Sequence, residues 1–121
     1  MTLESASGSH TIAVWVADTP AHREQGLMFV KSLAPGSGML FLFGEAQYVA
    51  MWMKNTYVAL DMVFIDAAGR ITNIAADTRP LSLETLNSAG PVIAVLELPA
   101  GAAQRFGLRP GDRASGPAFR L

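Results

Sequence analysis

The hydrophobic residues of this chain follow patterns that are typical of β-strands. Residues 11–17 (TIAVWVA) alternate between two faces, with three β-branched side chains on one face and Trp15 on the other. Residues 39–43 (MLFLF) and 92–98 (VIAVLEL) are almost continuously apolar, which is typical of strands that are buried on both faces. The chain is therefore expected to build its core from strands.

A hairpin is predicted in the middle of the chain. Residues 58–65 alternate, and they place the charged Asp61 on the same face as two apolar side chains. The turn sequence DAAG at 66–69 follows and residues 71–77 return, so these two strands are expected to pair antiparallel. Two further strands are expected, at residues 48–53 and within residues 113–121.

Helices are predicted only as short pieces. Thr19 is a suitable N-cap for a helix over residues 20–25, which begins with a proline and ends at Gly26. A second helix is expected over residues 102–106, and a single turn over residues 83–86. Six or seven short strands with two or three short helices predict a mainly β fold, either a small antiparallel β-barrel or a sandwich.

Length and composition indicate one domain. A chain of 121 residues, of which 50% are hydrophobic, is large enough to bury a core of its own. The first ten residues, MTLESASGSH, are polar and have neither the basic start nor the apolar stretch of a signal peptide. We therefore expect a flexible leader at residues 1–10, followed by a single domain at residues 11–121.

Charge and cysteine content exclude several classes of function. Nine Lys and Arg against ten Asp and Glu give a net charge of −1, and no basic run is present that could neutralise a series of phosphates. We therefore expect no nucleic-acid partner. The chain has no Cys, which excludes disulfides, thiolate catalysis and Cys-ligated zinc. No apolar run approaches the roughly 20 residues that span a bilayer, so a membrane-spanning protein is not expected.

The segment MWMKNTYVALDMVFID, residues 51–66, holds most of the candidate chemistry. It places Trp52, Lys54, Asn55 and Thr56 between two apolar runs, and polar groups in such a setting must be hydrogen-bonded. An aromatic platform beside hydrogen-bonding side chains suits a small polar ligand such as a sugar. The alternative is structural, since Asn-Thr after a strand also forms ordinary turns whose side chains bond to the local backbone.

The buried position expected for Asp61 raises the question of its partner. An ionised carboxylate on an apolar face needs compensation, and Arg23 or Lys54 could supply it as a structural ion pair. Arg23 could equally pair with Glu97. An alternative from another class is a hydrolase, in which Asp61 and Glu97 would act as paired carboxylates about 5–10 Å apart. The chain has no G-x-S-x-G motif and no phosphate-binding glycine loop, so binding is favoured over catalysis.

The methionines raise the possibility of a Cu(I) site. Met51 and Met53 would share one face of a strand, and Met28, Met39 and Met62 could join them as thioether ligands. Methionine is also a common gap-filler in hydrophobic cores. We favour the second interpretation and expect no metal or other cofactor.

Four segments together resemble a known family. They are VADTPAHREQGLM (Val16–Met28), MLFLF from Met39, MWMKNTYVALDMVFID from Met51, and VLELPAGAAQRFGLRPGD (Val95–Asp112). This combination resembles the DUF192 (UPF0127) family of uncharacterised bacterial and archaeal proteins. The resemblance implies a compact, mainly β fold and brings no established activity. Because many members carry export signals, it also implies an extracytoplasmic location, with the cytoplasm as the alternative.

These observations predict a binding module for a small polar ligand or a protein segment, with its oligomeric state open. The predicted site comprises Arg23, Trp52, Lys54, Asn55, Thr56, Asp61 and Glu97.

Overall fold

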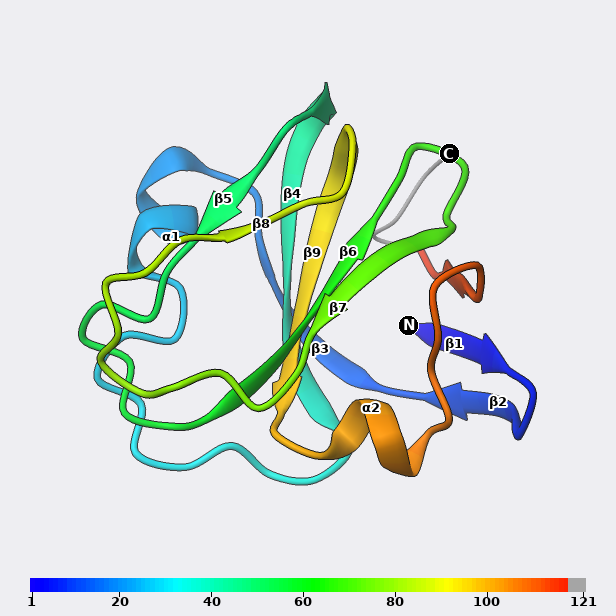
Figure 1. Cartoon of the computed structure of the whole chain (residues 1–121), viewed down its shortest axis with the longest axis horizontal. Coiled ribbons are helices and arrows are strands. Elements are labelled where there is room, and N and C mark those ends of the chain that lie inside the picture. Colours follow the sequence, from blue (N-terminus) through cyan, green and yellow to red (C-terminus); the bar gives the residue numbers. More distant parts are fainter. Residues whose placement is uncertain (118–121) are drawn as a thin grey trace.

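A five-stranded sheet forms the centre of the protein, which the computed structural model describes from residue 1 to residue 117 (Figure 1). In spatial order its strands are β3 (Ala13–Ala17), β4 (Ser37–Gln47), β9 (Val92–Pro99), β6 (Leu60–Ile65) and β7 (Ile71–Ala75). Because β9 lies in the middle, the side chains of β9 have neighbouring strands on both sides.

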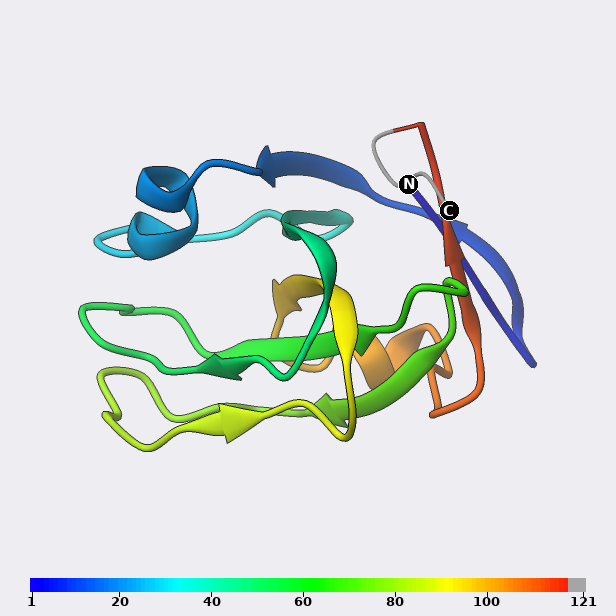
Figure 2. The same ribbon diagram turned by 90° about the horizontal axis from the view of Figure 1, so that it is seen from above.

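Two smaller sheets and two short helices complete the described fold. The strands β10 (Arg113–Ser115), β1 (Thr2–Ser5) and β2 (Gly8–Thr11) form one sheet, and β5 (Ala50–Met51) pairs with β8 (Leu86–Asn87). The helices are α1 (Pro20–Gln25) and α2 (Ala102–Arg105). In Figure 1, α1 and the β5–β8 pair lie on the left, and β1, β2 and β10 lie on the right. Figure 2 shows the same separation from above.

The protein is therefore mainly β, as expected, but residues 1–117 do not form a barrel. The three sheets stay separate, and β3 and β7 are the two edges of the central sheet, so it does not close on itself. Residues 1–117 contain ten strands, more than the six or seven expected, because several of the strands are only two to four residues long. Such short strands leave too little periodicity in the sequence to be recognised.

The central sheet confirms the predicted hairpin and contains one parallel pair among its antiparallel strands. Strands β6 and β7 pair antiparallel, with Val63 opposite Ile74, across a turn in which the Gly69 N–H donates to the Asp66 carbonyl at 3.0 Å. Strands β3 and β4 are parallel rather than antiparallel, with Val16 opposite Leu40. Parallel neighbours need a crossover connection, and residues 18–36, which include α1, provide it.

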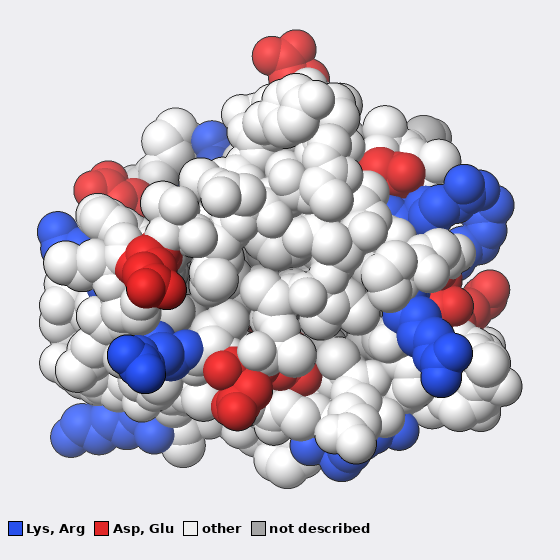
Figure 3. All heavy atoms as spheres, in the orientation of Figure 1, with Lys and Arg blue, Asp and Glu red and all other residues white. Residues whose placement is uncertain are grey.

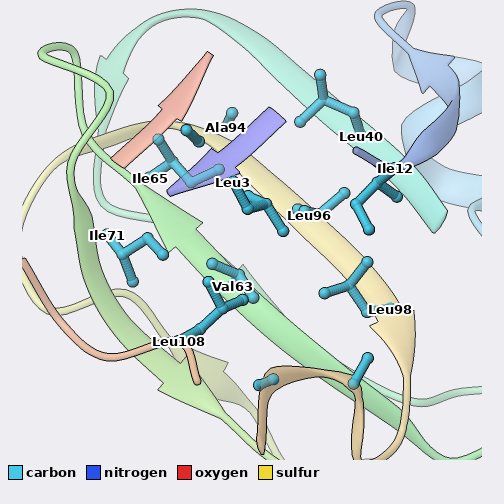
Figure 4. Close-up of a cluster of buried hydrophobic side chains, with 13 residues drawn as sticks. Leu3, Ile12, Leu40, Val63, Ile65, Ile71, Ala94, Leu96, Leu98 and Leu108 are labelled. Atoms are coloured by element: carbon cyan, nitrogen blue, oxygen red, sulfur yellow. The ribbon is translucent and has the colours of Figure 1, made fainter. Parts of the chain in front are cut away.

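The inner strands β6 and β9 of the central sheet are buried on both faces, which explains why they are almost continuously apolar. One face carries a cluster that includes Leu40, Val63 and Leu96 and that is covered by β1, β10 and α2 (Figure 4). The opposite face carries a second cluster that includes Phe41 and Val95. Successive side chains of each strand therefore point alternately into the two clusters. The site described below lies on the second face.

The helix boundaries agree closely with the sequence signals, while the weaker segments do not. The Thr19 side chain accepts a hydrogen bond from the His22 N–H, and Gly26 follows α1 with a φ of 49°. A Cβ at Gly26 would lie 3.0 Å from the Phe41 ring, so glycine permits this close packing. The expected turn at 83–86 is not helical, and only Ala50–Met51 of the expected strand at 48–53 pairs. No helix within residues 1–117 has the length and apolar character needed to cross a membrane.

Residues 1–10 are not a flexible leader. They contain β1 and most of β2, and β1 also pairs with β10. The Leu3 side chain is completely buried in the first core cluster (Figure 4), and the N–H of Ile12 donates to the Met1 carbonyl at 2.8 Å. The few apolar residues among polar ones in this segment give no clear periodic signal, so the sequence could not reveal this hairpin.

We expect Leu3→Ala to lower the free energy of unfolding by about 2–5 kcal/mol, because it leaves a cavity in the core. The matched control is Glu4→Ala, which changes an exposed side chain on the same strand and should have an effect within about 0.5 kcal/mol. Urea unfolding curves measure both. If Leu3→Ala lowered the free energy of unfolding as little as Glu4→Ala, residues 1–10 would not contribute to the stability of the fold.

Candidate functional site

A pocket of about 260 Å³ opens on the second face of the central sheet. Its walls come from residues 23–28 of α1 and the loop that follows, from Phe41 and Phe43 of β4, from residues within 50–56, and from Glu97 of β9. These segments are far apart in the sequence, and the crossover from β3 to β4 places α1 over the sheet at this point. The pocket is thus a product of the tertiary fold.

The pocket brings together five of the seven residues that the sequence singled out. They are Arg23, Trp52, Lys54, Thr56 and Glu97. The other two, Asn55 and Asp61, do not line it. The apolar walls were not recognised from the sequence, because residues such as Phe41 look like ordinary core positions in a buried strand.

Glu97 is the buried acid of the pocket. It lies on the central strand β9, opposite Met39 of β4 and Met62 of β6, and only 4% of its surface is exposed. Burial among apolar neighbours raises the pKa of the Glu97 carboxyl to about 8, because an ionised carboxylate loses its hydration there. At neutral pH Glu97 is therefore mostly an uncharged acid, which can donate one hydrogen bond and accept others.

Arg23 is fixed at the wall of the pocket by two interactions. Its Nη1 donates a hydrogen bond to the Leu42 carbonyl at 2.9 Å, and its guanidinium lies 5.6 Å from the centre of the Phe43 ring. Arginine on an aromatic face is a favourable cation–π contact. The side chain is therefore oriented before any ligand arrives.

Lys54 and Trp52 form the exposed part of the pocket. The Lys54 Nζ lies 5.1 Å from the centre of a Trp52 ring, and nearly half of the Trp52 surface is exposed. Both residues precede the turn at Asn55, whose φ of 54° is one that asparagine tolerates better than most residues. Lysine and tryptophan thus reach the same ligand-accessible space from neighbouring positions.

The Asn55-Thr56 pair is a turn, as the structural interpretation proposed, and also supports the pocket. The Thr56 N–H donates to the Met53 carbonyl at 3.0 Å, and the Thr56 hydroxyl donates to the Lys54 carbonyl at 3.1 Å. The Asn55 carbonyl accepts a hydrogen bond from the Phe29 N–H at 2.9 Å. This last bond ties the turn to the loop that follows α1.

Asp61 lies on the opposite face of the sheet, and the expected ion pair with Arg23 or Lys54 is wrong. Its carboxylate accepts three backbone hydrogen bonds, from the N–H groups of Asp77 at 2.8 Å, Gly101 at 3.0 Å and Ala103 at 2.9 Å. Backbone N–H groups therefore compensate this carboxylate in place of a cation. Two of them belong to the start of α2, so Asp61 anchors that helix to the sheet.

The hydrolase alternative fails for the same geometric reason. Asp61 is paired with Leu98, and the neighbouring pair is Met62 with Glu97. Successive residues of a strand point to opposite faces, so the sheet itself separates the Asp61 and Glu97 carboxylates. Paired carboxylates of a glycosidase must flank one bond of the substrate, and these two do not.

The methionines contribute to the core and to the pocket wall. The Met53 sulfur is buried and accepts a hydrogen bond from the Thr78 hydroxyl at 3.2 Å, while Met28 and Met51 line the pocket. Among residues 1–117, no group of three or more His, Asp or Glu residues is arranged to hold a metal ion. The absence of a Cu(I) site stays a prediction.

The comparison with protein families identifies the chain. The DUF192 family model, described as "Uncharacterized ACR", matches residues 2–116. The chain belongs to this family, as its four sequence segments indicated. The match begins within the hairpin that was expected to be a leader. No curated protein sequence matches the chain.

Two solved structures are similar over most of their length. One is described as a "putative transcription regulator" from Sinorhizobium meliloti 1021; it is 50% identical, with a TM-score of 0.90 over 93% of this chain and 88% of its own. The other is a protein of unknown function from Novosphingobium aromaticivorans DSM 12444; it is 39% identical, with a TM-score of 0.90 over 93% of this chain and 80% of its own. Both share the fold, and neither description names a ligand.

We expect Asp61→Asn to lower the free energy of unfolding by about 1–3 kcal/mol, because an amide NH₂ would face a backbone donor that the carboxylate now satisfies. Arg23→Met should change stability independently, so the double mutant should equal the sum of the two single effects within about 0.5 kcal/mol. Urea unfolding of the three variants tests this. A larger coupling energy would indicate an Asp61–Arg23 interaction.

We expect Glu97→Gln to stabilise the protein at high pH. Between the unfolded pKa of 4.5 and the folded pKa of about 8, the native state holds a proton that the unfolded state has lost, so wild-type stability falls as pH rises. The glutamine side chain of the variant cannot ionise and escapes this loss. The unfolding free energies of the two proteins should therefore diverge between pH 5 and pH 8, by about 1.4 kcal/mol for each pH unit in this range, and the variant should still be the more stable at pH 9. If the unfolding free energies of the two proteins changed in parallel with pH, burial would not have raised the pKa of Glu97.

Proposed function

We propose that this protein is a binding module that holds a small polar ligand in the pocket between α1 and the central sheet. The observation that carries the proposal is the buried acid of Glu97, which shares a pocket with Arg23 and Lys54 although no salt bridge joins it to either within the described chain. Burying an acid without a partner destabilises a fold. A role in binding explains why the site has this composition.

The size and walls of the pocket favour a small molecule over a protein segment. Its volume of about 260 Å³ lies just below the range of about 300–1,000 Å³ for most ligand pockets. Phe41, Phe43, Met28 and Met51 provide apolar walls, and the polar side chains come from α1, from the segment after β5 and from β9. This arrangement suits one compact ligand with an apolar part and a polar end.

The description of the Sinorhizobium relative raises nucleic-acid binding as a second candidate, but the charge of this chain does not favour it. The net charge is −1, and on the face shown in Figure 3 Lys and Arg side chains are interspersed with Asp and Glu around an uncharged centre. A nucleic-acid interface needs several cations that track successive phosphates. We therefore propose small-molecule binding as the function of the pocket.

A thermal-shift screen of small organic acids, amines, amides and sugars should identify compounds that raise the melting temperature of the wild-type protein. Trp52→Ala should reduce or abolish the shift, because it removes one wall of the pocket. The matched control is Trp15→Ala, since Trp15 is also exposed but lies outside this pocket, and it should keep the shift. Compounds that stabilise both variants equally, or the absence of any stabilising compound, would contradict the proposal.

A further inference from the structure

We propose that the pocket selects small organic anions, of the carboxylate class, and that Glu97 takes part as a hydrogen-bond donor to the bound anion. This inference rests on the proposed function and specifies the ligand of the same pocket. An ionised Glu97 would suit a bound cation. In this proposal Glu97 is protonated and contacts an anion instead.

The charged groups that face the pocket favour an anion. Arg23 and Glu24 come from α1, Lys54 comes from the loop after β5, and Glu97 comes from β9. The strands on either side of Glu97 add no charge, because its neighbours there are methionines. With Glu97 uncharged, two cations and one carboxylate line the space, and the net positive charge attracts an anionic ligand.

The aromatic groups do not offer an equivalent site for an amine. A bound ammonium could use the face of Phe43 or Trp52, but Arg23 already lies over Phe43 and Lys54 lies over Trp52. An amine would therefore have to displace a like charge before it could reach an aromatic ring. The protein's own cations thus select against cationic ligands.

Arg23 is suited to hold a carboxylate. Its bond to the Leu42 carbonyl uses Nη1 and fixes the plane of the guanidinium. A guanidinium has five N–H donors, and a carboxylate commonly accepts two of them in a bidentate pair. Lys54 at the exposed end can add a second positive charge.

Glu97 supplies the third contact when it is protonated. A neutral carboxylic acid donates its O–H to an anionic oxygen in a strong, short hydrogen bond, whereas an ionised Glu97 would repel the ligand. Because burial raises the pKa of Glu97 to about 8, the donor form prevails at neutral pH. Anion affinity should fall once the pH exceeds that value, and amine affinity should rise.

The test compares three probes of similar shape, benzoate, benzylamine and benzamide, by titration calorimetry at pH 6 and pH 9. We expect benzoate to bind best at pH 6 and to lose about tenfold in affinity at pH 9, because a group with a pKa of about 8 is about nine-tenths ionised there. Tighter binding of benzylamine, or equal binding of benzamide, would overturn the proposal.

Three variants separate the roles of the side chains. Glu97→Gln keeps an uncharged donor, so it should bind benzoate at both pH values and lose the pH dependence. Arg23→Lys keeps the charge but not the bidentate geometry, and it should weaken benzoate binding at least tenfold. The control Arg109→Met changes an exposed arginine outside the pocket and should bind like wild type.

The outcomes distinguish this inference from the proposed function. If the broad screen gives Trp52-dependent ligands and none is an anion, the anion proposal fails and the binding module stands. If Glu97→Gln binds benzoate with the wild-type pH dependence, Glu97 is not the donor. If benzoate binding is undetectable at millimolar concentration, carboxylate selection is overturned, whatever the screen finds.

Discussion

The position of β9 between β4 and β6 is the constraint on which the rest of the structure depends. Backbone pairing on both sides fixes the register of β9, and the register decides which side chains face each core. Glu97 and Asp61 belong to adjacent pairs in this register and therefore point to opposite faces. A shift of β9 by one residue would bury Leu96 and Leu98 in the pocket face and move Glu97 into the core beside α2, among the apolar side chains of the first cluster.

The two buried carboxyl groups show two ways in which a fold accommodates an acid. Asp61 is compensated by three backbone N–H groups and thereby joins α2 to the sheet. Glu97 has apolar neighbours on both adjacent strands, and its charged form is disfavoured by burial. The first arrangement stabilises the native state and needs no ligand to explain it. The second costs stability wherever Glu97 would otherwise ionise, and costs of this kind are typical of functional sites.

The accuracy of the sequence prediction depended on whether the deciding interactions were local. The cap at Thr19, the apolar run at 39–43 and the turn at 66–69 are encoded by neighbouring residues, so these elements were predicted correctly. The parallel pairing of β3 with β4 and the burial of Leu3 depend on contacts with distant residues. The same reason explains the error at Asp61, because alternation showed that it was buried but could not show which groups would meet it there.

The segment after β5 is a turn, and this turn also connects two walls of the pocket. Asn55 and Phe29 both have positive φ, and the Phe29 N–H donates to the Asn55 carbonyl. This bond joins the loop after α1 to the turn at Asn55; Arg23 lies in α1, before that loop, and Lys54 directly precedes the turn. Left-handed backbone at a residue such as Phe29 costs on the order of 1–3 kcal/mol and persists only where the surroundings enforce it. The bond therefore connects the wall of the pocket that contains Arg23 with the wall that contains Lys54, so the proposed site has both cations on connected backbone segments.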